Sequence, residues 1–350
     1  MVVLMKQKLL FPLMLVAASQ LHAAELNIYS WEGYISEDVI RQWENKTGHS
    51  VNVTYYESDE ARNEVLGTGR GQAFDLAIMD NISAQLFGKN NKLEALNEQN
   101  LPSLSHINQR WREMCGNFGY PYFWGTIGIV YNKNKVSVAP TSWGELLKPK
   151  PEYQKHIVML SDWTDTLVPA LLYENYSINT EDKKQLESAF NLLKSQAKSV
   201  LSYNYLMSYV ENDQIDSEMY MALGYSGDQN LLNEYSDNNE WVYSIPKEGT
   251  VIWMDCFSVM SWSTKKEMAL DFLNFINQPE IAAANALDIG GATANQAAYD
   301  LLPSEIKNDP LTYLPEETLD HTQTYRIISD DNVSLRHRIV NAVLKQHESE

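Results

Sequence analysis

Aromatic rings stand beside carboxylates at several points where the chain is predicted to form or leave a β-strand. Trp31, Glu32 and Tyr34 follow one predicted strand, and Trp253 and Asp255 lie two positions apart in another. A flat ring covers methylene groups and attracts cations to its face, while a carboxylate neutralises a positive charge. These pairs indicate a site for an organic cation that carries both charges and hydrocarbon.

The strand around Asp255 gives the sharpest form of this argument. Because side chains alternate along a strand, Trp253 and Asp255 are predicted to share one face. An aspartate in an otherwise apolar strand is costly to bury unless a cation or hydrogen-bond donors satisfy it. The alternative to a ligand is a salt bridge to a lysine of the same protein. Trp31 and Glu32 have a comparable alternative, as a ring over the core and an acid at the start of a helix.

Further candidate residues follow other predicted strands. Tyr225 and Asp228 lie at a predicted strand-to-helix turn, where Asp228 could instead cap the helix. Asp80 ends another strand, and Asp165 belongs to an acidic cluster after a third. The candidate ligand-binding residues are Trp31, Glu32, Tyr34, Asp80, Asp165, Tyr225, Asp228, Trp253 and Asp255.

No segment carries the spacing of a known enzyme signature. The glycines of 67–71 follow a predicted helix and lack the spacing of a dinucleotide-binding loop. Residues 224–228 place Asp228 where a nucleophile elbow requires glycine. The histidines lack the i, i+4 spacing of a zinc-binding helix, and two distant cysteines cannot form a thiolate metal site. We therefore expect no enzyme activity, no cofactor and no bound metal.

The elements that must position the candidates begin with an alternation of short apolar runs and helical stretches. Strands are predicted at 26–30, 50–56 and 74–79, and helices at 37–47, 59–67 and 81–88. This βαβαβα order implies a parallel sheet with helices on its faces. Ligands of such sheets bind beyond the carboxyl ends of the strands, at 30–32, 56–58 and 80–81 in this chain.

A second α/β block follows an extended segment at 119–131 that is predicted to leave the first lobe. The segment 180–197 places its apolar residues on one helical stripe, which is typical of a packing helix. Residues 242–245 and 251–259 flank a Pro-Lys-Glu-Gly turn and predict a β-hairpin. Residues 264–277 return to an amphipathic helix.

Residues 1–23 have the features of a secretory signal peptide. Lys6 and Lys8 precede an apolar run at 9–18 and the small pair at 23–24. That run is too short to span a bilayer permanently, and no later segment approaches the roughly 18 apolar residues of a membrane helix. No cysteine follows the signal to carry a lipid, so we expect a free periplasmic protein.

The chain is strongly acidic, with a formal net charge of −19. Loss of residues 1–23 would remove two lysines and no carboxylate. Such a protein is a poor partner for nucleic acid and for anionic membranes, and it attracts cationic small molecules. Solubility alone also accounts for part of this charge.

The length of residues 24–350 exceeds what one hydrophobic core organises, so two lobes are expected. An oxidising compartment permits a disulfide between Cys115 and Cys256. Their separation in sequence does not fix their distance, and two buried thiols are the favoured interpretation.

Seven segments in order resemble the bacterial spermidine/putrescine-binding protein family. They are YSWEGYI (29–35), YYES with the following DE (55–60), FDLAI (74–78), YPYFWGTIGIVYN (120–132), TSWGELLKP (141–149), IPKEGTVIWMDCF (245–257) and LDFLNFINQPEIA (270–282). The similarity runs through nearly all of the chain after residue 23, and the order of the segments carries it more than any single motif.

The resemblance implies an α/β, two-lobed periplasmic-binding-protein fold of type II. Each lobe would be a mixed, mainly parallel sheet flanked by helices, with a ligand cleft between the lobes. The implied domains are a signal peptide at 1–23, a first lobe of 24–132 and 254–304, and a second lobe of 133–253 and 305–350. The family's ligand positions fall on Trp31, Glu32, Gly33, Tyr34, Tyr225, Asp228, Trp253 and Asp255.

The sequence departs from the family at several of these places. It has Gly33 where members commonly carry an acid, Asp80 where they carry a small hydroxyl, and Trp163 where they carry an acid. Gly291 stands where some members have a tyrosine. These departures concern the number and spacing of the ammonium groups that the site recognises.

We therefore expect a monomer that closes around a linear polyamine of the spermidine, norspermidine or putrescine class. Rings would cover the carbon chain. Asp255 and Asp228 would neutralise the central or one terminal amine, with Glu32, Asp80 and Asp165 as candidates for the others. An arginine directed at an anion in this site would contradict the prediction.

The resemblance implies two membrane partners for the closed form. One is the permease of an ABC-type polyamine importer, which is the favoured partner. The other is the periplasmic domain of a GGDEF/EAL membrane signalling protein, as in relatives that report norspermidine or spermidine to enzymes controlling cyclic-di-GMP and biofilm formation. A secreted carbohydrate-active enzyme that stacks sugars on the same rings is less favoured, because it would need amide and arginine partners.

Overall fold

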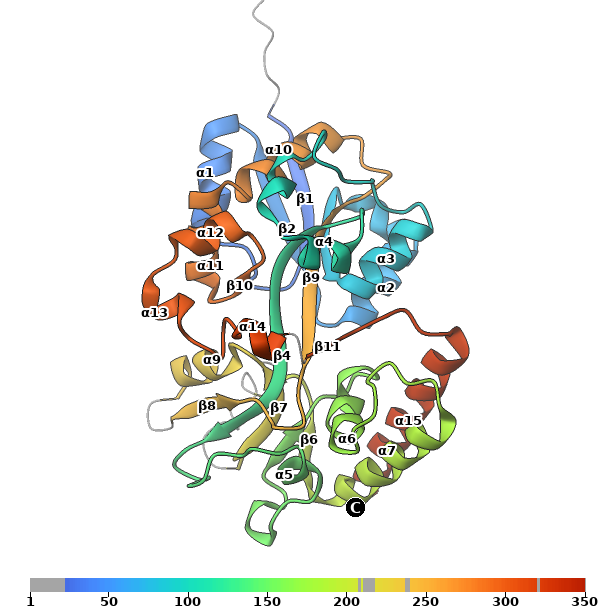
Figure 1. Ribbon diagram of the computed structural model, residues 1–350. Coiled ribbons are helices and arrows are strands. Elements are labelled where there is room, and N and C mark those ends of the chain that lie inside the picture. Colours follow the sequence, from blue (N-terminus) through green and yellow to red (C-terminus); the bar gives the residue numbers. More distant parts are fainter. Residues whose placement is uncertain (1–22, 207–208, 210–217, 237–239, 320–321, 350) are drawn as a thin grey trace, which may run out of the picture.

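The computed structural model describes residues 23–206, 209, 218–236, 240–319 and 322–349. The predicted signal peptide lies outside the described residues except for its last position. Among the described helices, none combines the length and the apolarity needed to cross a membrane. The described chain forms two lobes, one above the other in Figure 1.

The first lobe, the upper one in Figure 1, is built on a mixed sheet in the order β2-β1-β3-β9-β4. Its strands are β1 (Glu25–Ser30), β2 (Ser50–Tyr55), β3 (Leu76–Asp80), β9 (Val251–Val259) and β4 (Tyr120–Asn132), with β10 (Ala292–Thr293) on β4 and β11 (Gln323–Thr324) on β9. β1 pairs in parallel with β2 and β3, whereas β9 is antiparallel to both β3 and β4.

Helices cover this sheet and include the three connections that the sequence predicts. They are α1 (Glu37–Thr47), α2 (Asp59–Gly67), α3 (Asn81–Lys89), α4 (Gln109–Cys115), α10 (Lys266–Ile276), α11 (Pro279–Ile289), α12 (Gln296–Leu301), α13 (Ser304–Lys307) and α14 (Glu316–Leu319). Side chains cap the first three helices, because Ser36, Ser58 and Asp80 each accept a backbone N–H of the first turn. The βαβαβα prediction is confirmed.

The second lobe holds a sheet in the order β4-β7-β5-β6, with β8 on the other side of β4. Its own strands are β5 (Ile157–Met159), β6 (Val200–Tyr203), β7 (Met221–Tyr225) and β8 (Trp241–Ser244). Its helices are α5 (Gly144–Leu147), α6 (Val168–Tyr173), α7 (Lys183–Gln196), α9 (Asp228–Glu234) and α15 (Asp330–Glu348). The predicted packing helix is α7, which buries Leu186, Ala189 and Leu193.

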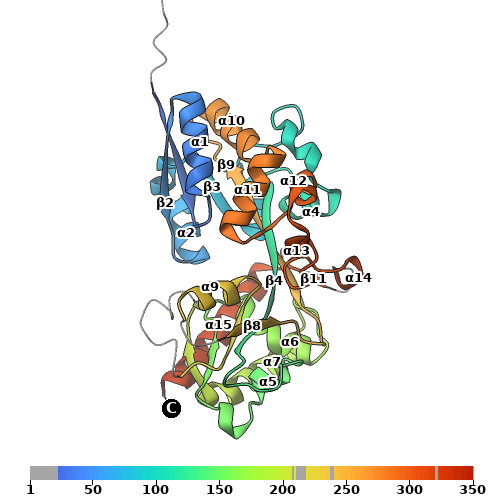
Figure 2. The same cartoon turned by 90° about the vertical axis from the view of Figure 1, so that its left-hand side faces the viewer.

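One strand joins the two sheets. The first half of β4, Tyr120–Thr126, pairs with β9, and the second half, Ile127–Asn132, pairs with β7 and β8. All of β4 is buried, and it runs through both lobes in Figures 1 and 2. The predicted hairpin of 242–245 and 251–259 is wrong, because in the described chain β8 and β9 pair with different halves of β4 rather than with each other.

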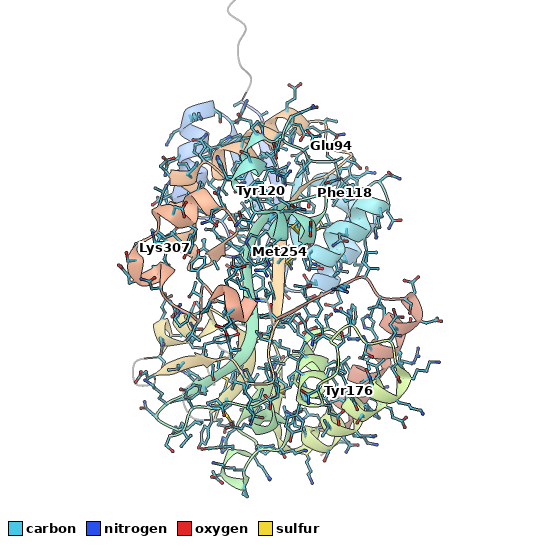
Figure 3. All side chains as sticks on the ribbon, in the orientation of Figure 1. Glu94, Phe118, Tyr120, Tyr176, Met254 and Lys307 are labelled. Atoms are coloured by element: carbon cyan, nitrogen blue, oxygen red, sulfur yellow. A yellow bond between two sulfur atoms is a disulfide. The ribbon has the colours of Figure 1, made fainter. Side chains whose placement is uncertain are left out.

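Each lobe has its own hydrophobic core. The first core includes Tyr120 and Met254, which are fully buried and labelled in Figure 3. The second core runs from Ile127 onward and takes Val340 of α15. Leu319, which falls in the stretch predicted for the second lobe, packs in the first core. The predicted domain boundaries stay a prediction.

A disulfide ties α4 to β9. Cys115 and Cys256 are both fully buried, and their Cα atoms lie 5.8 Å apart. The interpretation as two buried thiols is therefore wrong. Sequence spacing missed the pair because strand β9 returns to the first lobe from a distant part of the chain.

We expect the double substitution Cys115→Ala/Cys256→Ala to lower the free energy of unfolding by about 2–4 kcal/mol, because the bridge closes a long loop and restricts the unfolded chain. Urea titration followed by tryptophan fluorescence measures this loss. A thiol assay on the denatured, unreduced wild-type protein is the control and should find no free thiol. Equal stability of both proteins would contradict the prediction.

Candidate ligand-binding site

Aromatic rings from both lobes meet beyond the carboxyl end of β1. The ring centroid of Trp31 lies 4.5 Å from that of Tyr56 and 6.4 Å from that of Tyr205, which belongs to the second lobe. Trp253 makes an edge contact with Tyr225, with ring centroids 6.1 Å apart. The predicted rings Trp31, Trp253 and Tyr225 are therefore brought to the junction of the lobes.

Gly125 allows the ring of Trp253 to approach β4. A Cβ atom on Gly125 would lie 2.4 Å from the Trp253 ring and 2.5 Å from the Ser226 hydroxyl. Since neither separation is sterically possible, only glycine fits between the strand and the ring. The site therefore depends on this glycine in β4 as well as on the ring itself.

Trp253 and Asp255 lie on the same face of β9, as predicted. Both side chains are half-buried, whereas the alternating residues Ile252, Met254 and Cys256 are buried. Asp255 lies directly opposite Asp80 of β3 in the strand register. Like charges directly opposite each other on neighbouring strands destabilise a sheet. This part of the fold therefore needs donors or a cation.

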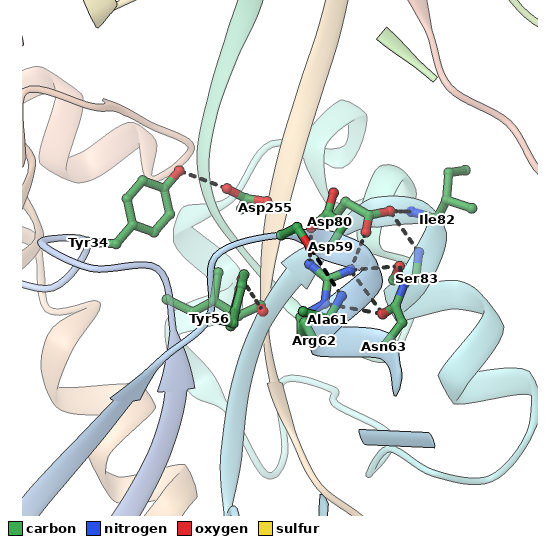
Figure 4. A network of polar contacts seen from close by, with 12 residues as sticks. Tyr34, Tyr56, Asp59, Ala61, Arg62, Asn63, Asp80, Ile82, Ser83 and Asp255 are labelled. Carbon is green, nitrogen blue, oxygen red and sulfur yellow. Dashed lines mark hydrogen bonds and ion pairs between the residues drawn. The ribbon is translucent and has the colours of Figure 1, made fainter. Parts of the chain in front are cut away.

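Asp255 has one hydrogen-bond donor among the described residues, shown in Figure 4. The hydroxyl of Tyr34 donates to Asp255 Oδ2 at 2.8 Å. Tyr34 is held in place by the Tyr122 hydroxyl, which donates to the Tyr34 carbonyl, and by the turn at Gly33, whose φ is 63°. Burial raises the pKa of Asp255 to about 6, and the nearby charge of Asp80 adds to this rise.

Asp80 is already engaged by the protein. Its Oδ1 accepts the backbone N–H groups of Ile82 and Ser83 at the start of α3, and its Oδ2 accepts Arg62 Nη2 at 2.6 Å. Burial would raise the pKa of Asp80, but the charge of Arg62 and the donors of Ser83 hold it below its usual range. Asp80 is therefore both a helix cap and half of an ion pair.

The arginine in this network is not free to bind an anionic ligand. Arg62 is fully buried, and its guanidinium pairs with Asp59 and Asp80 and donates to Ser83 Oγ and Asn63 Oδ1. Because carboxylates and neutral oxygens of the protein already accept from all three of its nitrogens, Arg62 does not contradict a site for a cation.

The second lobe contributes a carboxylate pair. Asp165 Oδ2 accepts from the Tyr225 hydroxyl at 2.6 Å, and Asp165 Oδ1 accepts from the Tyr325 hydroxyl. Asp162 Oδ1 accepts two backbone N–H groups, while its Oδ2 is buried and has no hydrogen-bond partner within the described part of the chain. Burial raises the pKa of both carboxyl groups, and the proximity of Asp165 raises that of Asp162 further.

The carboxylates of the two lobes face a common region. Burial raises the pKa of the Tyr205 hydroxyl, and carboxylates of both lobes, Asp162 and Asp59 first among them, raise it further. Asp80 of the first lobe likewise acts on Asp165 of the second. The arrangement is a concentration of negative charge between aromatic rings, which is suited to holding a cation.

Two predicted site residues, Glu32 and Asp228, do not join the side-chain hydrogen bonds described above. Glu32 is exposed. Asp228 accepts the backbone N–H of Tyr225 at 2.7 Å, and burial raises its pKa to about 7. Within the described chain, Asp228 makes no hydrogen bond to the other candidate side chains. Their role in ligand binding stays a prediction.

The sequence prediction did not select six residues of the site, namely Tyr56, Asp59, Arg62, Asp162, Tyr205 and Tyr325. Asp59 and Arg62 carried a signal, because an i, i+3 acid and base at the start of a helix after a strand can form an ion pair. Asp162 lay in the noted acidic cluster. Tyr325 lies in a C-terminal segment without a regular pattern, so nothing in the sequence pointed to it.

Comparison with known proteins gives a family and a fold. The family model described as bacterial extracellular solute-binding protein matches residues 38–314. A norspermidine sensor of Vibrio cholerae is 36% identical over 94% of this chain and 91% of that protein. The spermidine/putrescine-binding periplasmic protein of Escherichia coli is 28% identical over 86% of this chain and 87% of its own length.

Solved structures agree on the fold. The spermidine/putrescine ABC transporter substrate-binding protein PotD of Streptococcus pneumoniae superposes with a TM-score of 0.80, at 25% identity, over 93% of this chain and all of that one. A spermidine/putrescine ABC transporter protein of Listeria monocytogenes, described as putative, gives 0.81 at 26% identity over 91% and 98%. The predicted α/β periplasmic-binding-protein fold is confirmed.

The raised pKa of Asp255 predicts that this carboxylate destabilises the ligand-free protein. An aspartate titrates near pH 4 in the unfolded chain and near pH 6 in the folded one, so the folded state binds more protons between these values. Stability therefore falls as pH rises from about 4 to 6, and the full penalty is present above pH 6. Asp255→Asn should raise the free energy of unfolding at pH 8 by about 1–3 kcal/mol.

Urea titrations at pH 8 and pH 4.5 measure this difference. The gain should shrink strongly at pH 4.5, where the wild-type carboxyl is protonated. Asp288→Asn, at an exposed position of α11, is the matched control and should change little. A less stable Asp255→Asn protein at pH 8 would contradict the prediction.

Proposed function

The chain belongs to the spermidine/putrescine-binding family of bacterial extracellular solute-binding proteins, and from this premise we propose that it closes around a linear polyamine between its two lobes. The family consists of binding proteins and not of enzymes. One observation carries the proposal: carboxylates and aromatic rings of both lobes lie close together, and the buried oxygen Asp162 Oδ2 has no hydrogen-bond partner among the residues that the structure describes.

A polyamine is a string of methylene groups between ammonium groups, so its receptor must satisfy both. Trp31, Tyr205 and Trp253 offer rings for the carbons, at about 0.8 kcal/mol for each buried methylene. Asp255 and Asp162 offer carboxylate oxygens that pair with no lysine or arginine of the described segments. Each ammonium that reaches such an oxygen forms a charge-assisted hydrogen bond.

Closure follows from the same charges. In the ligand-free protein the carboxylates of the two lobes repel each other, which the raised pKa values of Asp162 and Asp165 reflect together with their burial. A polycation removes this repulsion only when the lobes are together. The ligand would therefore stabilise the closed form by its higher affinity for it.

We further propose that the protein acts in the periplasm. The Escherichia coli relative is named as a periplasmic protein. A buried disulfide between Cys115 and Cys256 is in keeping with an oxidising compartment.

Isothermal titration calorimetry with putrescine, spermidine, norspermidine and spermine tests the proposed ligand class. We expect binding of at least one triamine, and we expect Asp255→Asn to weaken it by roughly 30-fold or more, because removing one partner of a buried charge pair costs about 2–5 kcal/mol. Asp162→Asn should act in the same direction. Asp288→Asn is again the control. Absence of binding by the wild-type protein would overturn the proposal.

The biological role of binding has two candidates, import and sensing. Import through an ABC permease is the role implied by the names of the solved structures. The identity of 36% to a norspermidine sensor, against 28% to the Escherichia coli binding protein, favours sensing through a membrane signalling protein. On that observation we propose sensing over import.

A gene deletion in the native bacterium separates these roles. We expect the deletion to leave uptake of radiolabelled spermidine unchanged and to abolish the change in cyclic-di-GMP that external norspermidine causes. Complementation with the wild-type gene, but not with Asp255→Asn, should restore the response. Loss of uptake without loss of the response would establish import instead.

A further inference from the structure

We propose that Arg62 is a specificity-determining residue, a built-in cation that neutralises part of the site and so sets how many ammonium groups a ligand can bring. This inference rests on the proposed polyamine-binding function. It adds a rule for selectivity: the site discriminates between polyamines by their charge, because one positive charge is already supplied by the protein.

The contacts of Arg62 are those that a ligand cation would seek. Its guanidinium pairs with Asp59 and Asp80, donates to the Ser83 hydroxyl, and lies 5.4 Å from the centre of the Tyr56 ring. Two carboxylates, a hydroxyl and an aromatic face are a complete set of partners for an organic cation. Arg62 thus pairs, from within the protein, with groups that would otherwise be available to a ligand ammonium.

The Arg62 cluster belongs to the candidate site and is continuous with it. Tyr56, which covers the guanidinium, also packs against Trp31. Asp80, which Arg62 neutralises, is the strand partner of Asp255. Figure 4 shows Arg62 and Asp80 in one close-up with the Tyr34 to Asp255 hydrogen bond. A change in the charge of Arg62 therefore acts directly on the groups proposed to hold the ligand.

The burial of the partners shows which side of the cluster faces water. The side chain of Arg62 is 0% exposed, whereas those of Asp59 and Asp80 are 42% and 32% exposed. The guanidinium thus lies behind two carboxylates that water reaches. A ligand ammonium that approached these carboxylates would find them already paired. Without the arginine they would become a free anionic position.

The substitution Arg62→Met removes the charge and keeps an unbranched side chain of similar reach. We expect it to raise the affinity for spermine relative to spermidine by about tenfold, because one uncompensated carboxylate attracts the extra ammonium across a partly buried site. The opposite change, Asp59→Asn, leaves Arg62 paired with Asp80 alone and so removes the net negative charge of the cluster. It should lower the same ratio of affinities.

Calorimetric titration of the wild type and each variant with spermidine and spermine measures the ratio. Arg62→Lys keeps the charge and should stay near the wild-type ratio. Arg41→Met is the matched control, since Arg41 forms the same i, i+3 pair with Asp38 on the exposed surface of α1. If Arg62→Met does not fold, the variant Asp59→Asn still tests the proposal.

The outcomes separate the two proposals. A ratio that rises in Arg62→Met or, where that variant is unfolded, falls in Asp59→Asn supports a role in selectivity. A purely structural arginine would weaken both ligands by the same factor, and an unchanged ratio in the folded variants would overturn the inference while leaving polyamine binding intact. A wild-type protein that binds neither amine would instead overturn the proposed function.

Discussion

The structure depends on one electrostatic constraint, which is that negative charges are held close together in a place where water is scarce. Asp80 and Asp255 face each other across neighbouring strands, and Asp162 and Asp165 stand side by side in the other lobe. Such an arrangement is unfavourable in the empty protein. Arg62 compensates Asp80 from within the protein, whereas Asp255, Asp162 and Asp165 are left for a ligand cation to compensate. The repulsion that the ligand relieves is therefore available to drive binding and closure.

The fold keeps these charges in place by fixing the strands that carry them. Asp255 lies one residue before Cys256, and because side chains alternate along β9, the disulfide to α4 anchors the strand from the face opposite to Asp255. The continuous strand β4 passes from one sheet to the other beside β9 and carries Gly125, on which the Trp253 ring rests. The carboxylate and the ring therefore sit on the same rigid pair of strands at the junction of the lobes, while Asp162 and Asp165 lie in the second lobe. A motion that separates the lobes therefore separates the charges as well.

The sequence predicted those parts of the molecule that local periodicity determines. The alternation of short strands and helices gave the first sheet, and the two-residue spacing of Trp253 and Asp255 gave their shared face. It failed where pairing is decided by distant segments: a turn between two strand-like runs suggested a hairpin, but β8 and β9 find different halves of β4. For the same reason the partnership of Cys115 with Cys256, and the contribution of Tyr325, were not visible. Arg62 was missed for another reason, because its i, i+3 spacing from Asp59 indicates an ion pair but does not show that the arginine side chain is fully buried.

Selectivity in a site of this kind follows from charge more readily than from shape. Aromatic faces tolerate small changes in where a methylene chain lies, since stacking and burial vary slowly with position. Charges are less tolerant, because an ammonium without a carboxylate, or a carboxylate without a cation, is costly where water is excluded. Related proteins that share the rings could therefore differ in their preferred polyamine through single substitutions that add or remove one charge beside the site. An arginine behind two carboxylates is a position of this kind, because replacing it with a neutral residue changes the charge beside the site by one.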